Sequence, residues 1–161
     1  MTLDDMIRLA EDQARRVLIG TKEELAPMWM LRGLDGSVEI IATPWGGPEQ
    51  KHLTVEAMRS VMRKRQIIAY SLLVEAWFAH AERDEVNADG TIKGPMPSQR
   101  PDRKECVCIL AQDHYGARRN LHLEIIRDKS GRCAELRKMT GAEDVITGIF
   151  DDLLHTVGRP H

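Results

Sequence analysis

The chain has 161 residues, a length that fits one domain over residues 1–161, with 42% apolar and 30% charged residues. Folding buries roughly 70% of the surface of an unfolded chain of this size, so the fold needs neither a metal ion nor a disulfide. The formal net charge is −2. This near-neutral charge argues against non-specific binding to nucleic acid or to a membrane surface, because both need a marked excess of basic residues.

Signals for secretion and for membrane insertion are not evident in the sequence. The first residues, Met-Thr-Leu-Asp-Asp, lack the basic and apolar segments of a signal peptide. The longest nearly apolar run, residues 67–79, is too short to span a bilayer and contains Glu75. The cysteines Cys106, Cys108 and Cys133 are an odd and sparse set that fits reduced thiols. We therefore expect a soluble cytoplasmic protein without a cofactor and without a membrane segment.

A helix is predicted at the start of the chain. Apolar residues recur there at helical spacing, at positions 3, 7, 10, 14, 17 and 18, and charged residues fill the other side. Thr2 and Asp5 resemble a capping box in which Asp replaces the usual Glu. Gly20 is typical of the position just past a helix end.

Two short strands and a second helix are predicted next. Residues 28–32 and 37–43 are apolar runs on either side of Asp35-Gly36, a dipeptide typical of hairpin turns. A segment rich in proline and glycine ends the second run. A helix is then expected from about residue 49 or 52 to Gln66. Its apolar stripe consists of Leu53, Ala57, Met58, Val61 and Met62.

Residues 67–79 predict the central strand of a sheet, because they are apolar at both odd and even positions. A long polar segment follows at about residues 81–104, and loops of this length are usually functional or disordered. Further strands are predicted at residues 105–113 and 118–127, with a shorter strand at about 132–137.

A last helix is predicted from Thr140, which forms a capping box with Glu143. Its apolar side carries Val145, Ile146, Ile149, Phe150, Leu153, Leu154 and Val157. The order of elements is helix, two strands, helix, three strands, helix (α-ββ-α-βββ-α). This order resembles the topology of roadblock/profilin-like proteins. It predicts an α/β fold of the α+β type, with an antiparallel five-stranded sheet and helices on both faces.

The faces of the last strands depend on their register. If Asp113 pairs with Arg118, the period of two assigns every following side chain to one face or the other. One face then holds Cys106, Cys108, Leu110, Leu121, Leu123, Ile125, Ala134 and Leu136. The opposite face then holds Val107, Ile109, His122, Glu124, Ile126, Glu135 and Arg137.

Glu75 is the charged residue that the apolar pattern of its strand does not explain. Burying a carboxylate without a partner is costly, so Glu75 is paired, protonated or part of a site. An arginine partner, exposure at the end of the strand and a catalytic role all fit the sequence.

His122 and Glu124 share one face of a strand. They fit an acid/base pair, and they fit equally a cross-strand ionic ladder on a partly exposed face. Cys106 and Cys108 also share a face, and Cys133 or a histidine could join them in a zinc site. Structural zinc needs four well-spaced ligands, so we interpret the cysteines as core thiols and predict no metal.

Two groups of residues are candidates for contact with a partner. Trp29 and Trp45 flank the predicted hairpin, and tryptophan is enriched at interfaces as well as in cores. A basic group at the end of the second helix consists of Arg59, Arg63, Lys64 and Arg65. This group fits either a solvated helix end or a contact with an anion.

Motifs of common enzyme classes, such as a Gly-rich phosphate loop or a Gly-x-Ser-x-Gly elbow, are not found in the sequence. We expect a non-catalytic interaction module that forms a homodimer through an exposed sheet edge or the second helix. One alternative is a small metal-assisted hydrolase or nuclease-like enzyme that uses Glu75. Its histidine partner would be His80, His114 or His122. A second alternative is an adaptor that binds nucleic acid or another anionic ligand through residues 59–65.

Overall fold

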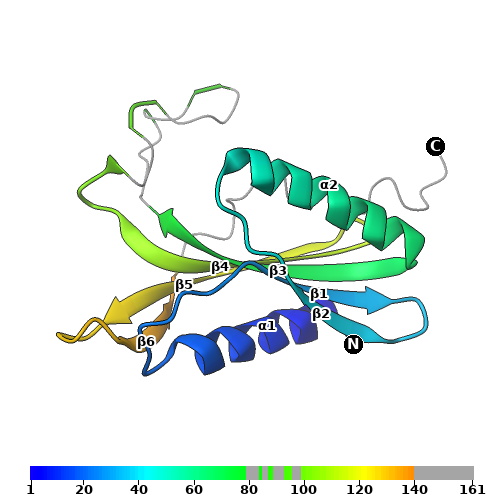
Figure 1. Ribbon diagram of the computed structural model, residues 1–161, viewed down its shortest axis with the longest axis horizontal. Helices are drawn as coiled ribbons and strands as arrows, with labels where there is room; N and C mark the ends of the chain where they lie inside the picture. Colours follow the sequence, from blue (N-terminus) through cyan, green and yellow to red (C-terminus); the bar gives the residue numbers. More distant parts are fainter. Residues whose placement is uncertain (79–83, 85–86, 89–92, 96–98, 140–161) are drawn as a thin grey trace.

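The structure is a computed structural model that describes residues 1–78, 84, 87–88, 93–95 and 99–139. These residues form a curled antiparallel sheet with one helix on each face (Figure 1). The helix expected from Thr140 and half of the loop expected at residues 81–104 lie outside the described residues. Neither helix in the described ranges is long and apolar enough to cross a membrane.

Two helices and six strands make up the described part of the chain. They are α1 (Leu3–Leu18), β1 (Met28–Gly33), β2 (Val38–Ala42), α2 (Pro48–Lys64), β3 (Ile67–Phe78), β4 (Lys104–Asp113), β5 (Arg118–Arg127) and β6 (Cys133–Lys138). The strands lie in the order β2-β1-β3-β4-β5-β6, with antiparallel neighbours throughout. This confirms the α+β class and the antiparallel sheet.

The predicted number of five strands is wrong, because the sheet has six, one for each of the six segments in which a strand is predicted. The short segment expected at about residues 132–137 pairs with β5 and is a full member of the sheet. Two side chains of this strand, Cys133 and Leu136, are buried in the core. These two apolar anchors hold a strand whose other residues are exposed.

α1 begins at the predicted capping box. The Thr2 hydroxyl accepts a hydrogen bond from the Asp5 N–H at 3.1 Å, and the Thr2 N–H donates to the Asp5 carboxylate at 2.8 Å. The hydrogen bonds from the backbone and side chain of Thr2 lower the pKa of Asp5. The buried stripe of α1 consists of Met6, Ala10, Ala14 and Leu18, whose spacing of four places them on one side of the helix.

The sheet has a separate apolar core on each face, which we call the α1 face and the α2 face. The core on the α1 face comprises Met6, Ala10, Ala14, Leu18, Leu25, Met30, Ala69, Leu73, Val107, Ile109, Leu123, Ile125, Cys133 and Leu136. The core on the α2 face comprises Trp29, Leu31, Val55, Met58, Met62, Ile67, Tyr70 and Leu72. β3 contributes to both cores and lies inside the sheet, as its apolar sequence predicts.

The predicted register of β4 and β5 is wrong by one residue. Arg118 lies opposite Gln112 and not opposite Asp113. Asp113 instead donates its N–H to the carbonyl oxygen of Ala117 at 3.1 Å, and its carboxylate accepts the N–H groups of Tyr115 and Ala117, each at 2.9 Å. Gly116 has a φ of 89°, which closes a three-residue turn.

The shift by one residue exchanges the faces of β5 relative to β4. Cys106 lies opposite Glu124, and Cys108 lies opposite His122, all on the α2 face. Leu123 lies opposite Val107 on the α1 face. Ala134, expected in a core layer, is exposed.

Candidate functional site

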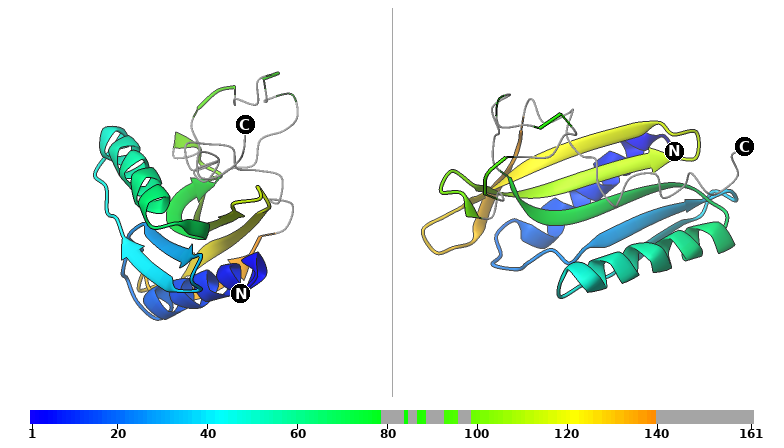
Figure 2. Two further views of the ribbon diagram at one scale, coloured as in Figure 1. Left: turned by 90° about the vertical axis from the view of Figure 1, so that its right-hand side faces the viewer. Right: turned by 90° about the horizontal axis from the view of Figure 1, so that it is seen from above.

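β2 forms one margin of the sheet, with α2 above it and α1 below it (Figure 2, left). Four of its five residues are exposed, and Ile41 is partly buried against the core of the α2 face. Ile40 is 54% exposed and Val38 is 40% exposed. Large aliphatic side chains on a margin that pairs with no further strand among the described residues favour pairing with another strand.

The backbone groups of β2 divide between its two sides. The Gly33 N–H donates to the Ser37 carbonyl oxygen at 2.9 Å, and the Thr43 N–H donates to the Pro27 carbonyl oxygen at 2.8 Å. Hydrogen-bonded and non-hydrogen-bonded pairs alternate along an antiparallel ladder. Residues 39 and 41 therefore direct their N–H and C=O groups to β1. Residues 38, 40 and 42 direct theirs outward, and we call this outward side the β2 edge.

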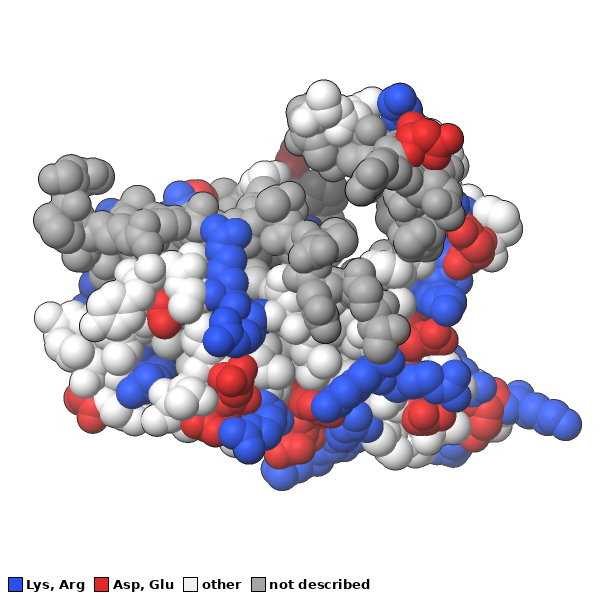
Figure 3. Space-filling model, turned by 180° about the vertical axis from the view of Figure 1, so that it is seen from behind, with Lys and Arg blue, Asp and Glu red and all other residues white. Residues whose placement is uncertain are grey.

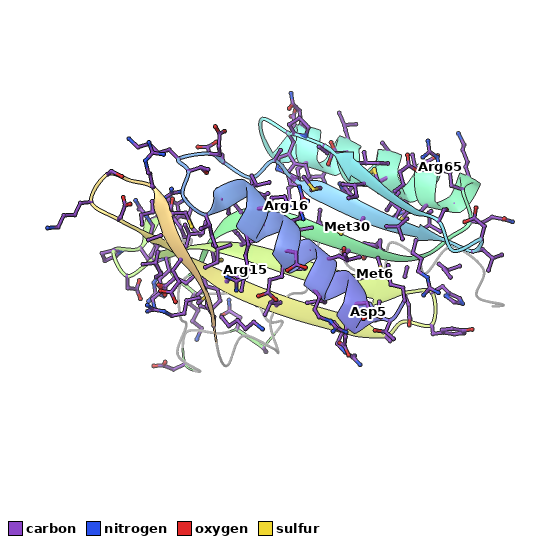
Figure 4. The ribbon with its side chains drawn as sticks, turned by 90° about the horizontal axis from the view of Figure 1, so that it is seen from below. Asp5, Met6, Arg15, Arg16, Met30 and Arg65 are labelled. Carbon is purple, nitrogen blue, oxygen red and sulfur yellow. The ribbon has the colours of Figure 1, made fainter. Side chains whose placement is uncertain are left out.

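The side chains of the β2 edge lie on the α1 face. Ile40 lies opposite Met30, which belongs to the core on that face. Figure 4 shows Arg16 on the side of α1 that faces β1 and β2, whereas Arg15 lies on the side of β5 and β6. Leu9, 41% exposed, lies two helical turns before Arg16 on the same side of α1. Val38 and Ile40 thus expose apolar surface at the strand margin, and Leu9 exposes apolar surface on the side of α1 that faces β1 and β2.

β6, at the opposite margin of the sheet, has a different character. Its exposed residues include the charged side chains Glu135, Arg137 and Lys138. Arg137 and Glu135 form an ion pair at 3.1 Å, and the ladder with β5 has an irregularity at Ile126 and Arg127. Charges and bulges are the devices by which natural sheets prevent pairing at an edge. The β2 edge contains neither along residues 38, 40 and 42.

The two tryptophans expected near the hairpin do not form a common surface. Trp29 is fully buried, and its indole Nε1–H donates to the Thr43 hydroxyl at 2.7 Å. Its ring lies 6.1 Å from that of Tyr70 in the core of the α2 face. Trp45 is partly buried. Trp29 therefore packs in the core and is not part of a surface that contacts a partner.

The basic group at the end of α2 is partly paired with acids. Arg65 forms an ion pair with Glu39 of β2, and Arg59 lies 3.7 Å from Glu56. Arg63 and Lys64 are exposed. In the view from behind, Lys and Arg side chains alternate with Asp and Glu along the lower part of the described surface (Figure 3). These observations give no support to a concentrated anion-binding surface.

Glu75 lies on the α1 face, where its carboxylate accepts the Leu25 N–H at 2.7 Å. Burial is the largest influence on Glu75 and raises its pKa, while the hydrogen bond from Leu25 and the charge of Arg127 act in the opposite direction. Arg127 itself is bonded to Glu105 at 2.7 Å. Glu75 thus has a local structural role as the acceptor that holds the segment between α1 and β1.

The histidines proposed as partners of Glu75 do not meet it in the described part of the chain. His122 lies on the α2 face, across the sheet from Glu75. His114 lies in the turn after β4, with its Nδ1 3.1 Å from the Ile68 carbonyl oxygen, at the other end of β3. His80 lies outside the described residues. Neither His114 nor His122 therefore forms an acid/base pair with Glu75.

His122 and Glu124 have neighbours that were not expected on their face. Cys108 and Cys106 lie opposite them on β4, and Lys104 binds Glu124 at 3.2 Å in a cross-strand ion pair. The sequence predicts that these four residues share a face only if the turn after β4 is known to have three residues. The signals were Asp113, whose carboxylate caps the turn, and Gly116, which favours a positive φ.

An open hollow of about 530 Å³ lies at the end of the sheet where β3 and β4 meet the segment before β4. It is lined by Trp77, Arg100, Pro101, Arg103, Lys104, Glu105, Glu124 and Ile125. The Arg103 guanidinium lies 4.5 Å from the centre of the Trp77 ring. Its mixture of acids and bases does not select one charge of ligand.

Among the described residues, no group of three or more His, Cys, Asp or Glu side chains is arranged to hold a metal ion. Comparison of the chain with models of known families, with curated proteins and with solved structures finds no match.

Proposed function

We propose that this protein is an interaction module that forms a homodimer through the β2 edges of two copies. The observation that supports this proposal is that the same three residues of β2 present both their backbone groups and their side chains to a possible partner strand. The residues whose backbone groups point outward, at positions 38, 40 and 42, are also those whose side chains are exposed on the α1 face. Backbone pairing and apolar contact would therefore be satisfied by one partner strand.

The β2 edge is complementary to itself when two copies run antiparallel. With Ile40 on the twofold axis, it pairs with Ile40 of the second copy, and Val38 pairs with Ala42. All three are hydrogen-bonded pairs, which exchange about six N–H to C=O bonds in total. Two sheets then join into one continuous sheet, in which Val38 and Ile40 of both copies lie side by side on one face.

The expected dimer is in equilibrium with its monomer. β2 has five residues, and stable interfaces bury about 1,600 Å² in total, which is more than one short strand supplies by itself. Dissociation is therefore expected on dilution.

Sedimentation velocity over a range of protein concentrations tests the proposal. The protein as it stands is expected to sediment as a dimer at high micromolar concentration and as a monomer after dilution. Ile40→Lys should sediment as a monomer throughout, because two lysines with Cα atoms about 5.5 Å apart would oppose like charges directly across the twofold axis.

Leu53→Lys is the matched control for Ile40→Lys. Leu53 is even more exposed, at 70%, and lies on α2 away from the β2 edge. This variant should retain the dimer, and circular dichroism should show both variants folded. A parent protein that stays monomeric at high micromolar concentration contradicts the proposal, as does a dimer that survives Ile40→Lys.

A further inference from the structure

Two cysteines lie side by side on the α2 face of β4. The Sγ atoms of Cys106 and Cys108 are 3.6 Å apart, and both thiols are free. Cys106 is fully buried, whereas Cys108 is partly exposed. Cys133, the third thiol, is buried on the α1 face. β4 is separated from β2 by β1 and β3, so this pair is independent of the proposed dimer interface.

The surroundings of the pair are asymmetric. Cys108 lies opposite His122, which is 3% exposed and has its ring 6.1 Å from that of Phe78. Cys106 lies opposite Glu124, the carboxylate that is bound to Lys104. The imidazole thus stands beside one thiol and the carboxylate beside the other.

This asymmetry separates the acidities of the two thiols. The hydrogen bond from Cys106 and then the hydrogen bond and charge of His122 lower the pKa of Cys108, against the opposing influence of burial. The hydrogen bond to Cys108, burial and the nearby charges of Cys108 and Glu124 raise the pKa of Cys106. The partly exposed thiol is therefore the stronger nucleophile, and the buried thiol stays protonated beside it.

We propose that Cys106 and Cys108 form a dithiol site that hydrogen peroxide oxidises to a disulfide within β4. The Cys108 thiolate attacks a peroxide oxygen, an S–O bond forms as the O–O bond breaks, and the leaving hydroxide takes up a proton to become water. The sulfur of Cys106 then attacks that of Cys108. An S–S bond forms, the S–O bond breaks, and the second water leaves with the proton of Cys106. The two thiols supply the two electrons that reduce the peroxide.

The geometry of the strand makes this disulfide strained and reversible. Neighbouring residues on one face of a strand have Cα atoms about 6.6–6.8 Å apart. Disulfides span Cα distances of roughly 4.4–6.8 Å, so the bond forms at the long end of this range. Strained disulfides are reduced easily. The pair is consequently suited to reversible oxidation rather than to permanent cross-linking of the fold.

Mass spectrometry after brief treatment of the folded protein with hydrogen peroxide tests the proposal. Trypsin releases Cys106 and Cys108 together in the peptide 105–118, and Cys133 separately in the peptide 133–137. The peptide 105–118 should lose two hydrogens and regain them with dithiothreitol, while Cys133 remains alkylatable. Cys106→Ser should leave a sulfenic acid on Cys108 that dimedone captures. Cys108→Ser should give no adduct at Cys106.

His122→Asn tests the positioning role of the imidazole. Oxidation at pH 6 should slow several-fold, because loss of the imidazole lets the pKa of Cys108 rise toward the pH of the assay, so that a smaller fraction of the thiol is ionised. The parent rate should vary little between pH 6 and 8, whereas the variant rate should rise with pH. Oxidation of Cys133 at the rate of the peptide 105–118 overturns the proposal. So does equal reactivity of Cys106→Ser and Cys108→Ser.

Discussion

Glu75 interrupts the apolar pattern of β3, and the structure gives this carboxylate one specific partner. It accepts the N–H of Leu25, a residue whose side chain is buried in the core of the α1 face. An unpaired buried N–H costs free energy, so the acceptor stabilises the segment that leads from α1 into β1. This backbone contact gives the carboxylate a structural role within the apolar pattern of β3.

The pH dependence of stability follows from the raised pKa of Glu75. The folded protein binds the proton of Glu75 more tightly than the unfolded chain does. The stability that Glu75 contributes is therefore fully present below its unfolded pKa and is lost as pH rises through its folded pKa. Glu75→Gln keeps an oxygen acceptor but carries no charge. Its stability relative to that of the parent protein should therefore increase as the pH is raised from 4 to 7.

Urea denaturation at both pH values measures this effect. Glu75→Leu removes the acceptor and should lower the free energy of unfolding by about 1–3 kcal/mol at either pH. If Glu75→Gln is as unstable as Glu75→Leu at pH 7, the charge itself is needed, and Arg127 rather than Leu25 is the important partner.

The different environments of the two tryptophans could not be predicted residue by residue. Both lie near the same hairpin, and both fit a core or an interface. Trp29 is buried because α2 packs over β1 and β3 and supplies Val55, Met58 and Met62 around it. That packing is set by contacts distant in sequence, which the local pattern around a single tryptophan does not contain.

At the scale of the elements, the sequence predicted most of the described helices and strands but not their register. Apolar periodicity predicts that residues 105–113 and 118–127 are strands, and this is confirmed. Their register depends on whether the loop between them has three or four residues. A difference of one residue moves every side chain to the opposite face. The proximity of Cys108 and His122 was missed for this reason alone.

The conformation of Gly116 is the part of this turn that a substitution can test. Its φ of 89° is unfavourable for residues with a Cβ atom. Gly116→Ala should destabilise the protein by about 1–2 kcal/mol in urea denaturation, whereas Gly116→Asn should cost less, because asparagine tolerates this conformation. Equal losses for the two variants would show that the space around Gly116, rather than its backbone angle, is the constraint.

The whole molecule is a sheet with two unlike margins. The additional strand, β6, carries exposed charges, whereas β2 is apolar and free of bulges along residues 38, 40 and 42. The order of elements along the chain did not reveal this difference, because it does not state which strand lies at which margin. β1 pairs with β3 although β2 and α2 separate them along the chain. This long-range pairing leaves β2 as the outer strand.

Self-pairing of the β2 edge makes a specific geometric prediction for a cysteine at position 40. Two copies of Ile40→Cys would lie across the twofold axis with Cα atoms about 5.5 Å apart, within the range of a disulfide. The control positions are Leu53→Cys, exposed on α2, and the parent protein, which reports on the native thiols.

Oxidative cross-linking of Ile40→Cys, read on a non-reducing gel, is the most direct measurement of the proposed homodimer. We expect a covalent dimer for Ile40→Cys that is several-fold more abundant than for Leu53→Cys or the parent protein, and that diminishes on dilution. An Ile40→Cys protein that cross-links no more than Leu53→Cys would contradict pairing through the β2 edge.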